Sequence, residues 1–258
     1  MAVLKRVILF AAILIVLTAV ITPIVLLSRR KPKGSRTPVA LDVSGKISER
    51  IKVEKYGTTP ETIQYLIERS MANEYKIGDV FDGHELIMKD YEKNLEKAVV
   101  VMKFPDGTMY VIISKVDLVG GTEKKGSDAV EVTVFEFAKK QGEAAYSRVE
   151  RRPIEVDLMN PPQKITKVLI EPKKAMYNVV PDELFSLRLG TLKHGEQVVE
   201  EDEEDDIQKI VILDTNGPNP KVVTVTSKRN GQNIERVYEL VDSNFNLISK
   251  KAKTTFMF

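Results

Sequence analysis

The chain has 258 residues, of which 43% are apolar and 29% charged, enough apolar content for a buried core and enough charge for solubility. It contains no cysteine, which excludes disulfides, cysteine-ligated zinc, iron–sulfur clusters and thiol nucleophiles. Seven of the 39 basic residues fall within the first 36 positions, which hold no acid, so the remainder is net acidic. A body without basic excess is unsuited to phosphate backbones, and no nucleic-acid partner is expected.

An apolar segment lies near the amino end, at residues 7–27, with the sequence VILFAAILIVLTAVITPIVLL and no charge. At ~1.5 Å per residue, a helix of this length spans about 32 Å, the thickness of a bilayer core. A cleaved signal peptide would have a shorter apolar region followed by small residues, whereas Ser28-Arg29-Arg30 follows here. We therefore expect a short tail at 1–6, a single transmembrane helix at 7–27, and the lipid bilayer as a partner.

A basic linker at residues 28–38 follows the apolar segment. Cations beside a membrane span favour the membrane surface. More of them flank the carboxyl end of the span than its amino end, which places the domain in the cytoplasm by the positive-inside rule. An outward-facing envelope or appendage component is the alternative. The expected membrane-surface contacts are Arg29, Arg30, Lys31, Lys33 and Arg36.

Residues 39–258 predict a strand-rich antiparallel domain, mainly β or α+β, with one or two helices. Segments 39–43 and 47–53 alternate in polarity and are expected to pair. A helix is predicted over 60–74, where Pro60 suits the first turn and Ile63 and Met71 belong to one apolar stripe at helical spacing. Residues 84–97 fit a helix or a strand equally well. No repeat at a fixed period is evident, and a candidate sub-boundary lies at 142–153.

Strands dominate after residue 98. The Pro105-Asp106-Gly107 turn predicts a hairpin between 99–104 and 109–116. Residues 130–137 alternate strictly, with Val132, Val134 and Glu136 on one face. Shorter candidate strands lie at 165–170 and 184–189.

The clearest hairpin is near the carboxyl end, where 222–226 and 234–241 flank Asn230-Gly231, a pair that favours a type I′ turn. That turn places Val223 opposite Tyr238 and leaves Thr224 and Thr226 on the more polar face. Residues 242–244 turn the chain again into 245–249, which predicts a three-stranded meander.

Seven consecutive carboxylates at residues 200–206 are the most conspicuous chemical feature. Such a run suggests a divalent-cation site, but calcium loops alternate ligands with spacers and include a glycine. Contiguous like charges repel and extend the chain, so a solvated loop is the preferred interpretation. A third interpretation is an acidic surface that contacts a basic partner. The weak metal candidates are Glu200, Glu201, Asp202, Glu203, Glu204, Asp205 and Asp206.

Histidine crowds with carboxylates only at Asp82-Gly83-His84-Glu85, and the one other histidine is His194. A turn with an exposed histidine is the preferred interpretation over a metal or general-base site. Neither a phosphate-binding glycine loop nor a serine nucleophile elbow occurs, and no cofactor is expected. The predicted function is therefore a membrane-anchored interaction or structural module with a protein partner or self-association. A hydrolase using dispersed carboxylates is the enzymatic alternative.

Overall fold

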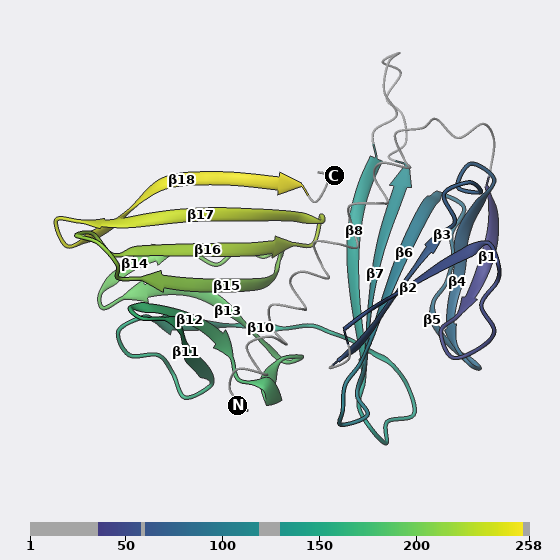
Figure 1. Cartoon of the computed structure of the whole chain (residues 1–258), viewed down its shortest axis with the longest axis horizontal. Helices are drawn as coiled ribbons and strands as arrows, with labels where there is room; N and C mark the ends of the chain where they lie inside the picture. Colours follow the sequence, from purple (N-terminus) through teal and green to yellow (C-terminus); the bar gives the residue numbers. More distant parts are fainter. Residues whose placement is uncertain (1–35, 58–59, 119–129, 255–258) are drawn as a thin grey trace, which may run out of the picture. The chain divides into compact units, whose positions relative to one another are not determined.

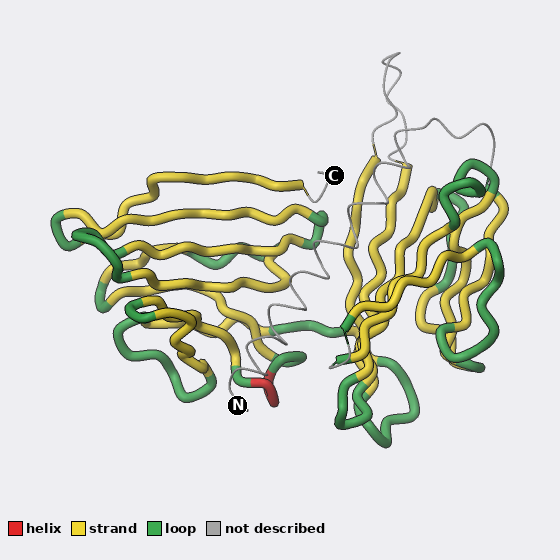
Figure 2. Tube along the Cα trace, viewed as in Figure 1, coloured by secondary structure: helices red, strands yellow, loops and turns green. Residues whose placement is uncertain are grey.

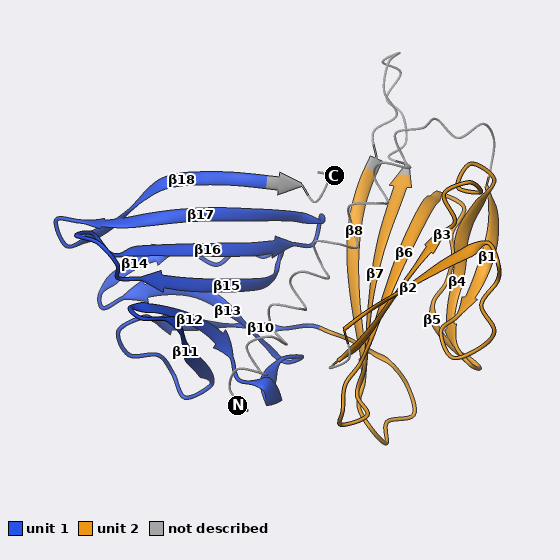
Figure 3. Ribbon diagram, viewed as in Figure 1, with its two compact units in different colours: residues 1–14, 150–255 blue, residues 15–149, 256–258 orange. Residues whose placement is uncertain are grey.

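The computed structural model of the chain describes residues 36–57, 60–118 and 130–254, nearly all in strands and turns (Figure 2). They form two compact units, the N-terminal unit (orange in Figure 3), which ends at Val149, and the C-terminal unit (blue), which begins at Glu150. This boundary falls inside the stretch 142–153. Within the described ranges no helix is long and apolar enough to cross a membrane, and the predicted span at 7–27 lies outside them.

The N-terminal unit consists of a small and a large β-sheet (Figure 1). The small sheet has the order β1-β4-β5, in which β1 and β4 are parallel. The large sheet has the order β2-β3-β6-β7-β8-β9 and is antiparallel throughout. The strands are β1 (Thr37–Asp42), β2 (Ile51–Tyr56), β3 (Glu61–Ile67), β4 (Tyr75–Asp82), β5 (Glu85–Met88), β6 (Asn94–Lys103), β7 (Met109–Leu118), β8 (Val130–Lys139) and β9 (Ser147–Arg148).

The C-terminal unit has the same arrangement, with a small sheet β10-β13-β14 and a large antiparallel sheet β11-β12-β15-β16-β17-β18. A 3-10 turn, η1 (Pro181–Glu183), is the one helical element among the residues described. The strands are β10 (Arg152–Asp157), β11 (Ile165–Glu171), β12 (Lys174–Val179), β13 (Leu187–His194), β14 (Gln197–Glu200), β15 (Asp206–Asp214), β16 (Lys221–Lys228), β17 (Gln232–Val241) and β18 (Asn244–Thr254).

The two units are therefore two versions of one design, which the sequence analysis did not detect. The parallel pair has the same register shift in both, between Val39 and Leu41 in β1 and between Ile154 and Val156 in β10. The offset between matching strands is 112 residues from β4 and β13 to β7 and β16, but it is 115 at β1 and β10 and 97 at β9 and β18, so no single period covers both units.

Matching positions also make matching polar contacts. A buried lysine of the large sheet donates to a glycine carbonyl of the small sheet, and a turn aspartate accepts from a glycine N–H. The lysine pairs are Lys97 Nζ to Gly78 O (2.9 Å) and Lys209 Nζ to Gly190 O (3.1 Å), and the aspartate pairs are Gly83 N to Asp42 Oδ1 (2.9 Å) and Gly195 N to Asp157 Oδ1 (3.1 Å).

Each unit buries its core between the small sheet and one face of the large sheet. The N-terminal core joins Leu41 and Val80 to Tyr65, Val99 and Ile113. The C-terminal core has the corresponding composition, with Val156, Leu192, Tyr177, Val211 and Val222. Strands β6 and β7 bury both faces, which accounts for their nearly continuous apolar sequence.

The helix predicted over 60–74 is wrong. Residues 61–67 form β3, which lies between β2 and β6 in the large sheet. Ile63 and Tyr65 enter the core, while Gln64 and Leu66 are buried on the opposite face. A strand buried on both faces is apolar at most positions, so residues at helical spacing are apolar as well and the period is ambiguous.

Two neighbouring predictions are also revised. Strands occur near 39–43 and 47–53, but β1 and β2 do not pair with each other, since β1 joins β4 and β2 joins β3. The ambiguous stretch 84–97 contains β5, a turn, and the start of β6, so its first part is a strand.

Several hairpin predictions are confirmed. Strands β6 and β7 form the hairpin around Gly107, whose φ of +83° only glycine adopts readily. Val132, Val134 and Glu136 of β8 are buried on one face, and β11 occupies the predicted 165–170. The predicted strand at 184–189 begins only at Leu187. Strands β16, β17 and β18 form the meander.

The register of the β16–β17 hairpin is one residue away from the prediction. Val222, not Val223, lies opposite Tyr238. The turn is the cause: Gly231 N–H donates to Lys228 O (3.0 Å) and Gly231 has φ +76°, so three residues link the strands. A one-residue slip exchanges the faces of a strand, so Thr224 is fully buried instead of lying on a polar surface.

Candidate functional site: a buried ion network

The acidic run at 200–206 is only in part the solvated loop that the sequence predicted, because residues 201–205 form a largely exposed loop whereas both ends of the run are buried. Glu200 ends β14 and Asp206 begins β15, and their exposed fractions are only 6% and 3%. Glu201, Glu203 and Glu204 between them are exposed. The two ends of the run therefore lie in the interior of the C-terminal unit. Four cations contact the run: Arg188, Lys209, Lys228 and Arg236.

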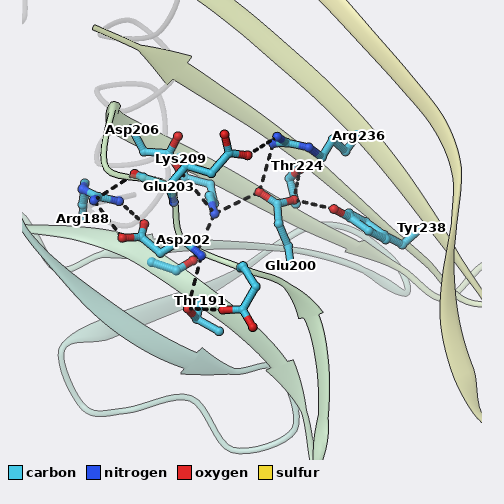
Figure 4. Close-up of polar contacts among 12 residues, drawn as sticks. Arg188, Thr191, Glu200, Asp202, Glu203, Asp206, Lys209, Thr224, Arg236 and Tyr238 are labelled. Atoms are coloured by element: carbon cyan, nitrogen blue, oxygen red, sulfur yellow. Dashed lines mark hydrogen bonds and ion pairs between the residues drawn. The ribbon is translucent and has the colours of Figure 1, made fainter.

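Glu200 lies at the centre of this network (Figure 4). One carboxylate oxygen lies 2.9 Å from Lys209 Nζ and accepts from Arg236 Nη1 at 3.3 Å. The other accepts from the hydroxyls of Thr224 (2.6 Å) and Tyr238 (3.0 Å). Burial, followed by the nearby Glu200 charge, raises the pKa of the Tyr238 hydroxyl. Four donors thus hold one buried carboxylate.

A second cluster surrounds Lys228. Its Nζ lies 2.7 Å from Glu203 Oε2, 2.7 Å from Asp205 Oδ1 and 2.5 Å from Asp206 Oδ1. Burial alone would lower the pKa of Lys228, but the hydrogen bonds that its ammonium group donates to Asp205, Asp206 and Glu203 outweigh it and raise that pKa. These same three carboxylates have oxygens within 4.8 Å of one another, close enough for a metal ion. An ammonium group already fills the space among them, so the arrangement is an internal ion cluster.

Arg188 closes the network on the side of the small sheet (Figure 4). Both its terminal nitrogens donate to Asp202, one of them at 2.9 Å. Asp202 N–H in turn donates to the Thr191 hydroxyl (3.3 Å), and Glu201 accepts from that hydroxyl (3.4 Å). The network therefore links β13, β14, β15, β16 and β17 through side chains as well as through backbone ladders.

The N-terminal unit keeps part of this network and replaces the rest with apolar residues. Asp90 pairs with Lys97 and with Lys76 (2.8 Å). Across β6, β7 and β8, however, Val99 lies opposite Ile113, which lies opposite Phe135. At the matching places in β15, β16 and β17, Val211 lies opposite Thr224, which lies opposite Arg236. Among the residues that the structure describes, the extended ion network thus occurs only in the C-terminal unit. Sequence reasoning missed its cations, because Lys228 and Arg236 lie in strands far from the acidic run and nothing in the sequence marks Lys209, three residues after Asp206, as buried.

Arg36, expected at the membrane surface, is instead 7% exposed and contacts Glu96 at 3.2 Å. Its guanidinium also donates to Leu95 O (3.2 Å). Burial raises the pKa of Glu96 to about 7, although the charge of Arg36 opposes this. The other four members of the basic linker lie outside the described residues.

The histidine candidates belong to different units. Asp82 to Glu85 is the β4–β5 turn with Gly83 at φ +62°, and His84 is exposed, as expected for a turn. Glu85 and Asp82 contact Lys139 and Tyr146. His194 packs edge-on against Phe245 with ring centroids 5.1 Å apart.

Comparison of the chain with protein-family models, with curated proteins and with solved structures gave no match. The interpretation of the site therefore depends on its own geometry. Every carboxylate of the network has a cationic or hydroxyl partner, and Glu200 and Lys209 are nearly inaccessible to solvent. Such an arrangement fixes strands relative to one another and is poorly suited to receiving a substrate.

Proposed function

We propose that the chain is a single-pass membrane-anchored interaction or structural module. The observation that carries this proposal is the engagement of the acidic run by Lys209, Lys228, Arg236 and Arg188 of the same unit. The acidic run at 200–206 is thereby interpreted as a structural element that connects strands. Two rigid β-units behind an anchor would present surfaces to other membrane components, whose local concentration the anchor raises.

The enzymatic alternative would require a reachable carboxyl group with a raised pKa. Glu96 has such a pKa but is 1% exposed and contacts Arg36. The pKa values of Asp90 and Glu203 are lowered, and each has lysine partners that donate hydrogen bonds to it. These observations favour the interaction module over a hydrolase.

The anchor and its orientation are tested together with one cysteine label, since the chain contains no cysteine. Glu143→Cys, in the exposed turn before β9, would be probed in intact and permeabilised cells with a membrane-impermeant maleimide. We expect the chain to resist alkaline extraction from membranes and to be labelled only after permeabilisation. Labelling in intact cells would place the domain outside, and release by alkali would refute the anchor.

A further inference from the structure

Two asparagines of the chain are followed by glycine, and the fold holds the two pairs differently. Asn216-Gly217 lies in the loop between β15 and β16, and Asn230-Gly231 forms the turn between β16 and β17. Such a pair can lose ammonia without an enzyme, because glycine has no side chain to obstruct the attack of its backbone nitrogen on the asparagine side chain. The two pairs therefore allow a comparison within one unit.

The first pair lies in a loop that is held at both ends. Before the pair, Thr215 donates from its backbone N–H and from its hydroxyl to Lys173 O, both at 2.8 Å. After it, Pro220 O accepts from Leu240 N–H at 2.9 Å. Residues 216–219, between these two contacts, are all exposed. This stretch can therefore change conformation without breaking the hydrogen bonds of the neighbouring strands.

Neither reacting group of the first pair is held. Among the residues that the structure describes, the Gly217 N–H has no acceptor and the Asn216 side-chain amide has no hydrogen-bond partner. The Asn216 N–H donates to Asp214 Oδ1 at 2.9 Å, a bond that leaves the side chain and the next nitrogen unrestrained. A Cβ added to Gly217 would meet nothing within 4 Å, so the approach to this residue is open.

The second pair is held at both reacting groups. Gly231 is buried and its N–H donates to Lys228 O at 3.0 Å, so the nitrogen is engaged in the turn. The Asn230 side-chain oxygen accepts from Gln232 N–H at 3.0 Å, which fixes the side chain. Breaking one such hydrogen bond slows a reaction by about fivefold, so the two together slow it by roughly 25-fold.

We propose that Asn216 is a site of spontaneous deamidation, whereas the turn at Asn230 is protected from it. The Gly217 nitrogen loses its proton and attacks Cγ of Asn216, which closes a succinimide ring. The bond from Cγ to the side-chain nitrogen breaks, and that nitrogen takes up a proton and leaves as ammonia. Water then adds to one of the two imide carbonyls and opens the ring, which restores the glycine N–H and leaves aspartate or isoaspartate. No oxidant or reductant takes part.

The reaction changes the charge of the loop and leaves the sheet intact. It adds a carboxylate two residues from Asp214, and isoaspartate also adds one methylene group to the main chain. Because Thr215 and Pro220 hold the ends of the loop, the ladder that begins with Asp214 opposite Lys221 persists. The C-terminal unit thus gains negative charge with age on an exposed loop. This inference goes beyond the proposed interaction role and does not depend on it.

The test is incubation of the full chain in detergent at mildly alkaline pH, followed by tryptic digestion and mass spectrometry. Trypsin cleaves after Lys209 and Arg229, so the two sites appear in separate peptides, and fragmentation locates the modified residue. We expect deamidation at Asn216 to be roughly 25-fold faster than at Asn230. A sample digested at once measures conversion during digestion, and Asn216→Gln, which would have to close a larger ring, should lose the signal at this site.

The same incubation in guanidinium chloride separates the effect of the fold from that of the neighbouring residues. In the unfolded chain both pairs lose their hydrogen bonds, so Asn216 and Asn230 should react at comparable rates. An unconverted Asn216 in the folded chain, or equal rates at the two sites there, would overturn the proposal. A difference that persists in the unfolded chain would also overturn it, because the sequence alone would then account for the selectivity.

Discussion

Replacing Lys209 with methionine should destabilise the C-terminal unit selectively. The Lys209 ammonium is fully buried, 2.9 Å from Glu200 Oε1, and donates to Gly190 O at 3.1 Å. Removing one member of a buried ion pair typically costs about 3–5 kcal/mol. Glu200 retains Arg236, Thr224 and Tyr238, which places the expected loss near the lower end, about 3 kcal/mol.

Hydrogen exchange with mass spectrometry separates the two units in one sample. For amides that exchange through unfolding, about 3 kcal/mol corresponds to roughly a hundredfold faster exchange. Lys209→Met should accelerate exchange in β15 and leave β6 unchanged. Lys97→Met is the matched control, since Lys97 is equally buried and donates to Gly78 O, and it should reverse the pattern. Exchange in β15 within threefold of the unaltered chain would refute the structural role of the network.

Three further predictions concern Glu96 and two pairs of matched positions. Glu96 should lose its proton near pH 4.5 in the unfolded chain and near pH 7 in the folded unit, so the free energy of unfolding of the N-terminal unit should fall by about 3 kcal/mol as the pH rises from 4.5 to 7. Urea unfolding measures this pH dependence, and Glu96→Gln should weaken it. Gly190→Ala, whose added Cβ would lie 2.8 Å from Pro153 Cβ, should destabilise by about 1–3 kcal/mol in the same assay and by more than Gly78→Ala, where the distance is 3.0 Å. Asp42→Ala and Asp157→Ala should each cost about 0.5–1.5 kcal/mol to their own unit, because each removes one exposed turn hydrogen bond whose glycine N–H then turns to water; equal effects on both units would contradict this.

Local patterns predicted the hairpins well because turn chemistry acts over a few residues. The Gly107 turn, the alternation of β8 and the final meander depend on neighbouring residues and were recognisable. The slip at the β16–β17 turn shows the limit. Asn230-Gly231 is compatible with two-residue and three-residue links, and the core selects the second by burying Thr224 beside Glu200.

Features that depend on distant partners were not accessible. The interpretation of 200–206 as solvated assumed that like charges remain in water, but Lys209 from β15, Lys228 from β16 and Arg236 from β17 neutralise the buried ends of the run, Glu200 and Asp206, inside the fold. The helix predicted over 60–74 failed for a related reason. Strand β3 is buried on both of its faces, with Ile63 and Tyr65 in the core and Gln64 and Leu66 buried on the opposite face, and this erased the polar alternation that marks a strand.

Two units of one design in a single chain create a risk of exchange, in which a strand is inserted into the wrong sheet during folding. The ion network distinguishes the copies. If β7 and β8 occupied the places of β16 and β17, Ile113 and Phe135 would stand where Thr224 and Arg236 now hold Glu200. A buried carboxylate without a cationic partner costs several kcal/mol, so the misassembled form would be less stable than the correct one. The buried charges of the C-terminal unit thus favour the pairing of each strand with its own unit.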